Sequence, residues 1–158
     1  MIRKDALAAI AVFVIVLTAH ALSPNATPFD SRWTIPIALS ILHERNTNLD
    51  EYLPLLERDQ FYAIECILPD GRRVFPVRSA ADCPGGHFYN FYPVAVPALV
   101  APAVLALEKG IAAAQLAPAG SDFRRAFLTG DLVGGSMIAE LLIASLIVAL
   151  ASSWPSAA

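Results

Sequence analysis

The sequence predicts a mainly α-helical integral membrane protein with about three transmembrane helices. It also predicts an external α+β loop region, with an interfacial amphipathic helix and a short β-hairpin. The chain of 158 residues is 56% hydrophobic and 16% charged, whereas soluble domains are about 45–50% apolar and about 25% charged. The apolar excess lies in residues 6–22, 91–107 and 132–151, and a polar stretch, residues 23–90, separates the first two.

The first transmembrane helix is expected over residues 5–22. A bilayer core needs about 20 apolar residues in a helix, with a range of roughly 17–25. Arg3 and Lys4 precede the run, as they would in a signal peptide. The run is longer than the apolar region of about 7–15 residues in a signal peptide, so an uncleaved anchor is favoured. Two prolines in residues 23–28 end the helix.

An amphipathic helix is expected over residues 31–44. Trp33, Ile37 and Ile41 fall near one face at helical spacing. Pro36 lies in the first turns, where proline is best tolerated. Beside a membrane exit, such a helix is expected to lie in the interface. The alternative is a helix packed inside a soluble subdomain.

A short helix and a hairpin follow. The helix is expected over residues 49–58, and the strands over residues 61–68 and 73–77. Pro69-Asp70-Gly71-Arg72 is a strong turn signal between the two strands. The aromatic run Phe88–Pro93 suits the membrane interface, where aromatic side chains gather.

The second and third transmembrane segments are expected over residues 91–109 and 132–153, joined by a linker over residues 110–131. Regular helix is expected from about Pro97, with a kink at Pro102. Glu140 interrupts the third segment, and an acid at membrane depth is a functional candidate by default. It also suits the interfacial zone if the span begins a few residues later.

The basic residues predict the topology. Residues 1–4 and the linker carry lysine and arginine, which favours the cytoplasmic side for both. Residues 23–90 are then extracytoplasmic, and the expected location is a bacterial inner membrane. Cys66 and Cys83 would face an oxidising space, so a disulfide between them is a candidate; two separate thiols are the alternative.

Several classes of ligand are not indicated. The net charge of −3 gives no basic face for nucleic acid. The sequence has no CxxC pair and no Cys/His cluster, so neither a metal site nor a cofactor is expected. His20 and His43 are best interpreted as ordinary polar or partly buried residues.

The order of these features resembles the N-terminal part of type C glycosyltransferases. These polytopic enzymes include the dolichyl-phosphate-mannose protein mannosyltransferases and the bacterial aminoarabinose transferases. The resemblance spans roughly residues 5–150 and rests on three runs that follow the first helix: Asp30–Ser40, Asn48–Tyr52 and Gly86–Pro93.

The resemblance implies a sugar transfer from a polyprenyl-phosphate donor to an acceptor hydroxyl on the extracytoplasmic face. By position, Asp30 matches the acid that acts as general base, although Ser31 stands where many relatives have a second acid. The expected substrate-binding residues are Arg32, His87, Tyr89, Asn90 and Tyr92. Capping of the amphipathic helix is the alternative role for Asp30, and a lipid headgroup is the alternative partner for Arg32.

The chain is much shorter than type C enzymes, so it is expected to be an N-terminal fragment that is inactive without the remainder of the polytopic enzyme. The competing hypothesis is a small three-helix membrane protein that acts as a binding or assembly subunit. Membrane lipid is an expected partner in both cases.

Overall fold

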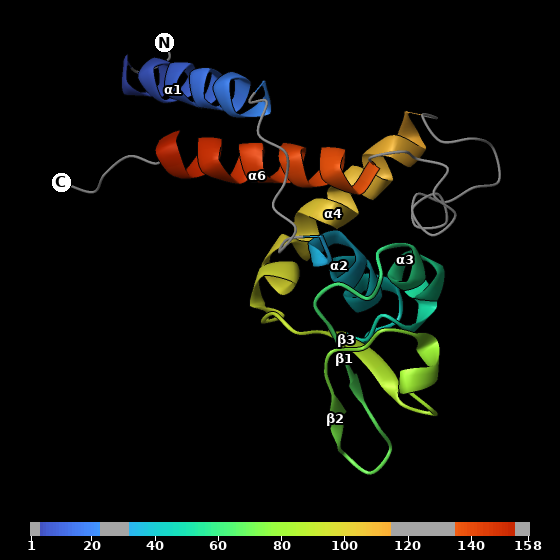
Figure 1. Cartoon of the computed structure of the whole chain (residues 1–158). Helices are drawn as coiled ribbons and strands as arrows, with labels where there is room; N and C mark the ends of the chain where they lie inside the picture. The colour runs from blue at the N-terminus through green and yellow to red at the C-terminus, as the bar shows by residue number, and fades with distance from the viewer. Residues whose placement is uncertain (1–3, 23–31, 115–134, 154–158) are drawn as a thin grey trace.

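The structure, a computed structural model, describes residues 4–22, 32–114 and 135–153. Within these ranges the protein is mainly helical, with five α-helices and one small antiparallel sheet (Figure 1). The helices are α1 (Lys4–Ala21), α2 (Thr34–His43), α3 (Leu53–Arg58), α4 (Ala95–Ala113) and α6 (Gly135–Ser153). The strands are β1 (Ile64–Ile67), β2 (Arg73–Val74) and β3 (His87–Asn90), and two 3₁₀ helices are η2 (Asp50–Tyr52) and η3 (Ala80–Asp82).

Helix α2 is a core helix and does not have the one-sided burial of an interfacial helix. Six consecutive residues, from Ile35 to Ser40, are buried. A helix that lay in the interface would leave its polar face in water, so the expected interfacial position is wrong, and α2 is packed within the folded part of the chain. The helix packs against α4, and His43 Nε2 lies 3.0 Å from Glu108 Oε1 at the end of that contact.

The sheet has three strands in the order β2-β1-β3, where the sequence predicted a two-stranded hairpin. Both predicted strands are shorter than expected. Strand β1 begins late because residues 59–63 form turns, and β2 ends at Val74. The unexpected strand β3 comes from the aromatic run assigned to the membrane interface. It pairs with β1 antiparallel, with Cys66 opposite Phe88. The pairing gives the backbone of β3 a hydrogen-bonding partner that a sequence pattern cannot reveal.

The core of this subdomain lies between α2, η2, α3 and one face of the sheet. Trp33, Tyr52, Leu56 and Ile64 are all fully buried there. Fully burying one such large apolar side chain contributes about 1.5–3 kcal/mol, so the subdomain has a substantial core of its own. The predicted short helix is present as η2 followed by α3, whose second residue, Pro54, occupies a favourable position near the helix start.

The apolar segments form helices close to their predicted bounds. By length and composition, α4 is the one described helix that is long and apolar enough to cross a membrane, and α1 and α6 contain the shorter apolar stretches Ala6–Ala19 and Ile143–Ser152. Helix α4 begins at Ala95, two residues before the expected start, and contains Pro102. Its exposed side chains include Leu99, which is 79% exposed.

Helices α1 and α6 pack side by side and run in opposite directions (Figure 1). Three successive membrane crossings would make the first and third helices run in the same direction. The observed pairing and the expected three crossings are therefore different arrangements. The side chain of Glu140 lies outside the described residues.

Candidate functional site

The predicted general base, Asp30, lies outside the described residues, and the description resumes at Arg32. Arg32 is in the turn that leads into α2. Its Nη1 atom lies 3.3 Å from Asp59 Oδ1, at the end of α3. The Asp59 side chain is only 14% exposed and that of Arg32 is 32% exposed. The ion pair therefore fixes the guanidinium of Arg32 against α3 while part of it faces solvent.

An open depression of about 330 Å³ surrounds this ion pair. It is lined by Arg32, Arg58, Asp59, Gln60 and Tyr62. Two guanidinium groups and one carboxylate leave the lining with a net charge of +1. Guanidinium groups bind phosphate through two parallel N–H donors, so the depression can accept an anionic phosphate group.

The chain conformation after α3 shapes the depression. Gln60, Phe61 and Ala63 all have left-handed backbone, with φ between 52° and 55°. Such residues are strained unless the surroundings hold them, and they gather at functional sites. Here the Phe61 amide donates to Leu56 O at 2.8 Å, and the buried Trp33 donates its indole N–H to Tyr62 O at 2.7 Å. These hydrogen bonds to the start of α2 and to α3 therefore hold the edge of the depression in place.

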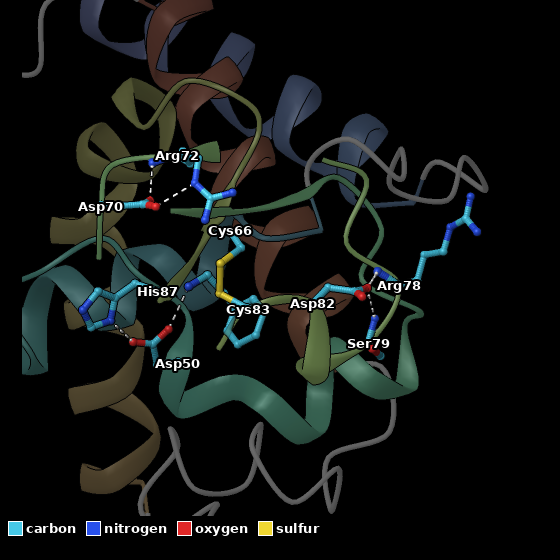
Figure 2. The surroundings of a disulfide bond; sticks show 10 residues. Asp50, Cys66, Asp70, Arg72, Arg78, Ser79, Asp82, Cys83 and His87 are labelled. Carbon is cyan, nitrogen blue, oxygen red and sulfur yellow. Dashed lines mark hydrogen bonds and ion pairs between the residues drawn. A yellow bond between two sulfur atoms is a disulfide. The ribbon is translucent and has the colours of Figure 1, made fainter. Parts of the chain in front are cut away.

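His87 belongs to a different cluster. Its Nδ1 atom lies 2.6 Å from Asp50 Oδ2, and Asp50 Oδ1 accepts the Phe88 amide at 2.8 Å. Because a carboxylate only accepts hydrogen bonds, Nδ1 is the protonated nitrogen of this imidazole. The Asp50 carboxylate therefore joins η2 to the start of β3 (Figure 2).

The direction of β3 separates the predicted substrate-binding residues. His87 pairs with Ile67, whereas Asn90 pairs with Ile64 at the opposite end of the strand. The Phe91 amide then donates to Ala63 O at 2.8 Å, so the Asn90 end is next to the chain that follows Tyr62. His87 is therefore at the end of β3 remote from the depression that Arg32 lines.

The three other predicted residues lie along or just after β3. Tyr89 pairs with Glu65 in the ladder and is partly buried. Asn90 Oδ1 accepts the Tyr92 amide at 3.3 Å, so this side chain stabilises the turn that leads to α4. Asn90 and Tyr92 are at the end of the sheet nearer the depression, but neither lines it.

Cys66 and Cys83 form a disulfide with a Cα–Cα distance of 5.7 Å (Figure 2). This pairing is the candidate that the sequence suggested. Two exposed carboxyl groups flank it. Hydrogen bonds from the side chain and backbone of Arg72 lower the pKa of Asp70, and those from the amides of Arg78 and Ser79 lower the pKa of Asp82. Both aspartates stabilise local turns beside the bond.

Arg58, Asp59 and Gln60 were missed as site residues. The only signal was a short polar run at the end of a predicted helix, and nothing in it indicates that Arg32 lies beside Asp59. In the described ranges, no three His, Cys, Asp or Glu side chains gather closely enough to hold a metal ion.

Comparisons with known proteins add no relative. No model of a known protein family, no curated protein and no solved structure matches the chain.

Proposed function

We propose that this chain is the N-terminal part of a membrane glycosyltransferase that uses a polyprenyl-phosphate sugar donor on the extracytoplasmic face. The observation that carries the proposal is the cationic depression around Arg32. It is lined by two arginines and begins two residues after Asp30 in the sequence. The transfer requires a site that binds the phosphate of the donor and a carboxylate that acts as the base. In this chain the two are close together in the sequence.

In the proposed reaction, Asp30 removes the proton of the acceptor hydroxyl. The hydroxyl oxygen then bonds to the anomeric carbon of the sugar as the bond from that carbon to the phosphate oxygen breaks. Polyprenyl phosphate leaves with the electron pair of the broken bond. A positioned general base contributes typically about 10²–10⁴-fold, and Arg32 stabilises the negative charge that develops on the leaving phosphate.

Two features of the chain support an extracytoplasmic membrane setting. The Cys66–Cys83 disulfide is typical of proteins that fold in oxidising compartments. Helix α4 is long and apolar enough to cross a bilayer.

Phosphate binding is tested on the chain reconstituted in nanodiscs, with a short-chain polyprenyl phosphate as the probe. We expect Arg32→Gln to weaken binding about 10- to 100-fold, because a hydrogen bond to a charged group contributes about 1.5–3 kcal/mol. The control is Arg45→Gln, since Arg45 is exposed and does not line the depression. Equal affinities for both variants and the parent chain would refute the phosphate site.

The transfer step is tested in membranes that contain the complete natural enzyme. Asp30→Asn keeps the shape of the side chain and removes the base, so transfer should fall by about two orders of magnitude or more. Asp70→Asn is the matched control on an exposed turn. Undiminished transfer by Asp30→Asn would assign Asp30 to helix capping and leave another group as the base.

The antiparallel pairing of α1 with α6 favours a second candidate function. In it the two helices form a closed pair that carries the disulfide-bonded subdomain, as a small binding or assembly subunit would. This candidate predicts that Arg32→Gln and Asp30→Asn leave sugar transfer unchanged.

A further inference from the structure

A surface cluster of three aromatic rings lies where the sheet meets α4. The rings of Phe75 and Phe91 stack with centroids 5.0 Å apart, and Tyr92 meets Phe91 edge-on at 6.0 Å. These rings are large apolar groups, yet Phe75 is 56% exposed, Phe91 57% and Tyr92 37%. Because they come from two separate segments, one just after β2 and one just after β3, folding creates this apolar surface and leaves it exposed.

Basic side chains surround Phe75 in the sequence. Arg72, Arg73 and Arg78 are all exposed, and Asp70 is the only acid among residues 68–78. Three arginines against one aspartate give residues 68–78 a net charge of +2, and Glu65 of β1, which pairs with Arg73 at 3.4 Å, lowers that of the whole hairpin arm to +1. Arginine has an apolar stem and a charged end, so it suits the boundary between headgroups and acyl chains.

The aromatic cluster continues directly into the exposed apolar surface of α4. Tyr92 is three residues before Ala95, where α4 begins. Val94, Val96 and Leu99 are 43%, 57% and 79% exposed. A helix of membrane length that begins at an exposed group of tyrosine, phenylalanine and arginine has the composition of a membrane entry point, where aromatic side chains gather at headgroup level.

We propose that Phe75, Phe91 and Tyr92, with the arginines of residues 72–78, form a docking surface for the headgroup region of an anionic bilayer. The surface holds the hairpin arm of β1 and β2 against the membrane where α4 enters it. The aromatic rings bind at the boundary of the acyl chains, and the arginines bind anionic headgroups. This inference shares with the proposed function only the membrane location, since it requires neither a sugar donor nor Asp30.

Photo-crosslinking of the full chain in nanodiscs tests the proposal. The nanodiscs contain phosphatidylethanolamine and phosphatidylglycerol, and Phe75→benzoylphenylalanine supplies the photoprobe. The control is Glu57→benzoylphenylalanine, since Glu57 is exposed on α3. We expect about tenfold more lipid adduct, measured by mass spectrometry, from position 75 than from position 57. Replacing the lipids with phosphatidylcholine should lower the yield at position 75 about fivefold, because the arginines lose their anionic partners.

Equal lipid adducts at positions 75 and 57 would overturn the proposal. Adducts of position 75 with a protein in place of lipid would also overturn it, and would assign the aromatic surface to a protein partner. A yield that does not depend on anionic lipid would remove the arginines from the docking surface. No sugar donor is present in the nanodiscs, so these outcomes are independent of whether the chain belongs to a glycosyltransferase.

Discussion

Reduction of the Cys66–Cys83 disulfide should weaken the sheet by about 3 kcal/mol. The bond closes a loop with a sequence separation of 17 residues. The chain-entropy treatment gives about 3 kcal/mol at 25 °C for a loop of this size. Cys66 is in the central strand and pairs with both Val74 and Phe88. The loss should therefore act on all three strands rather than on one turn.

Hydrogen exchange measured by mass spectrometry gives the magnitude directly. The full chain in nanodiscs is compared before and after reduction with a phosphine. A loss of about 3 kcal/mol corresponds to about a hundredfold fall in amide protection, since each tenfold factor is about 1.4 kcal/mol. The informative amides are those of residues 64–67 and 87–91. Among them, Phe91 donates to Ala63 O at 2.8 Å.

The matched control is the middle of α4, residues 98–107, whose amide bonds lie within the helix and far from the disulfide in sequence. Protection there should not change on reduction. A fall of less than about threefold in the sheet would refute loop closure as the source of stability. A fall of equal size in α4 would show that the disulfide stabilises the whole protein, and would refute the confinement of its effect to the subdomain.

Three further predictions concern other parts of the chain. Gly86→Ala should destabilise the oxidised sheet by about 1–3 kcal/mol, because an added Cβ would lie 2.6 Å from Ile67 O and 2.8 Å from Cys66 Sγ. A thermal unfolding midpoint in detergent equal to that of the parent chain would contradict this close packing. Single-cysteine labelling at position 71 and at position 120, in a chain without the native cysteines, should report opposite sides of the membrane, as the distribution of basic residues predicts. Labelling from the same side at both positions would instead support the antiparallel pairing of α1 and α6. The contribution of Asp82 to stability should be present above its ordinary pKa and lost as pH falls through its lowered pKa in the folded chain. The reason is that the amides of Arg78 and Ser79 bind the ionised carboxylate. A carboxyl NMR titration with a midpoint at or above the ordinary value would be inconsistent with those hydrogen bonds.

The local elements could be predicted from the sequence, because their signals are local. The apolar runs predicted the three long helices to within a few residues of α1, α4 and α6. Pro69–Arg72 predicted the turn between β1 and β2, in which Gly71 has a φ of 83° and the Gly71 amide donates to Leu68 O. Glycine is the residue that adopts this conformation most readily.

The site could be predicted only in part. Arg32 was selected from the sequence as a substrate-binding residue, and it lines the depression. Its partner Asp59 was not, since an ion pair between distant segments depends on how α2 and α3 pack. The same limit applies to His87. The sequence does not show which residue it meets, and the register of β3 places it beside Asp50.

By itself, the sequence determined where the chain is apolar, where it turns and where its two cysteines lie, because each depends on residue type and spacing along the chain. The tertiary structure decided which surfaces meet. It buried residues 35–40 of α2, paired Phe88 and its neighbours with β1 as a third strand, and stacked Phe75 on Phe91. These outcomes depend on backbone pairing and side-chain packing between distant segments, whose free energy is shared among many contacts and is not encoded in any single local run of residues.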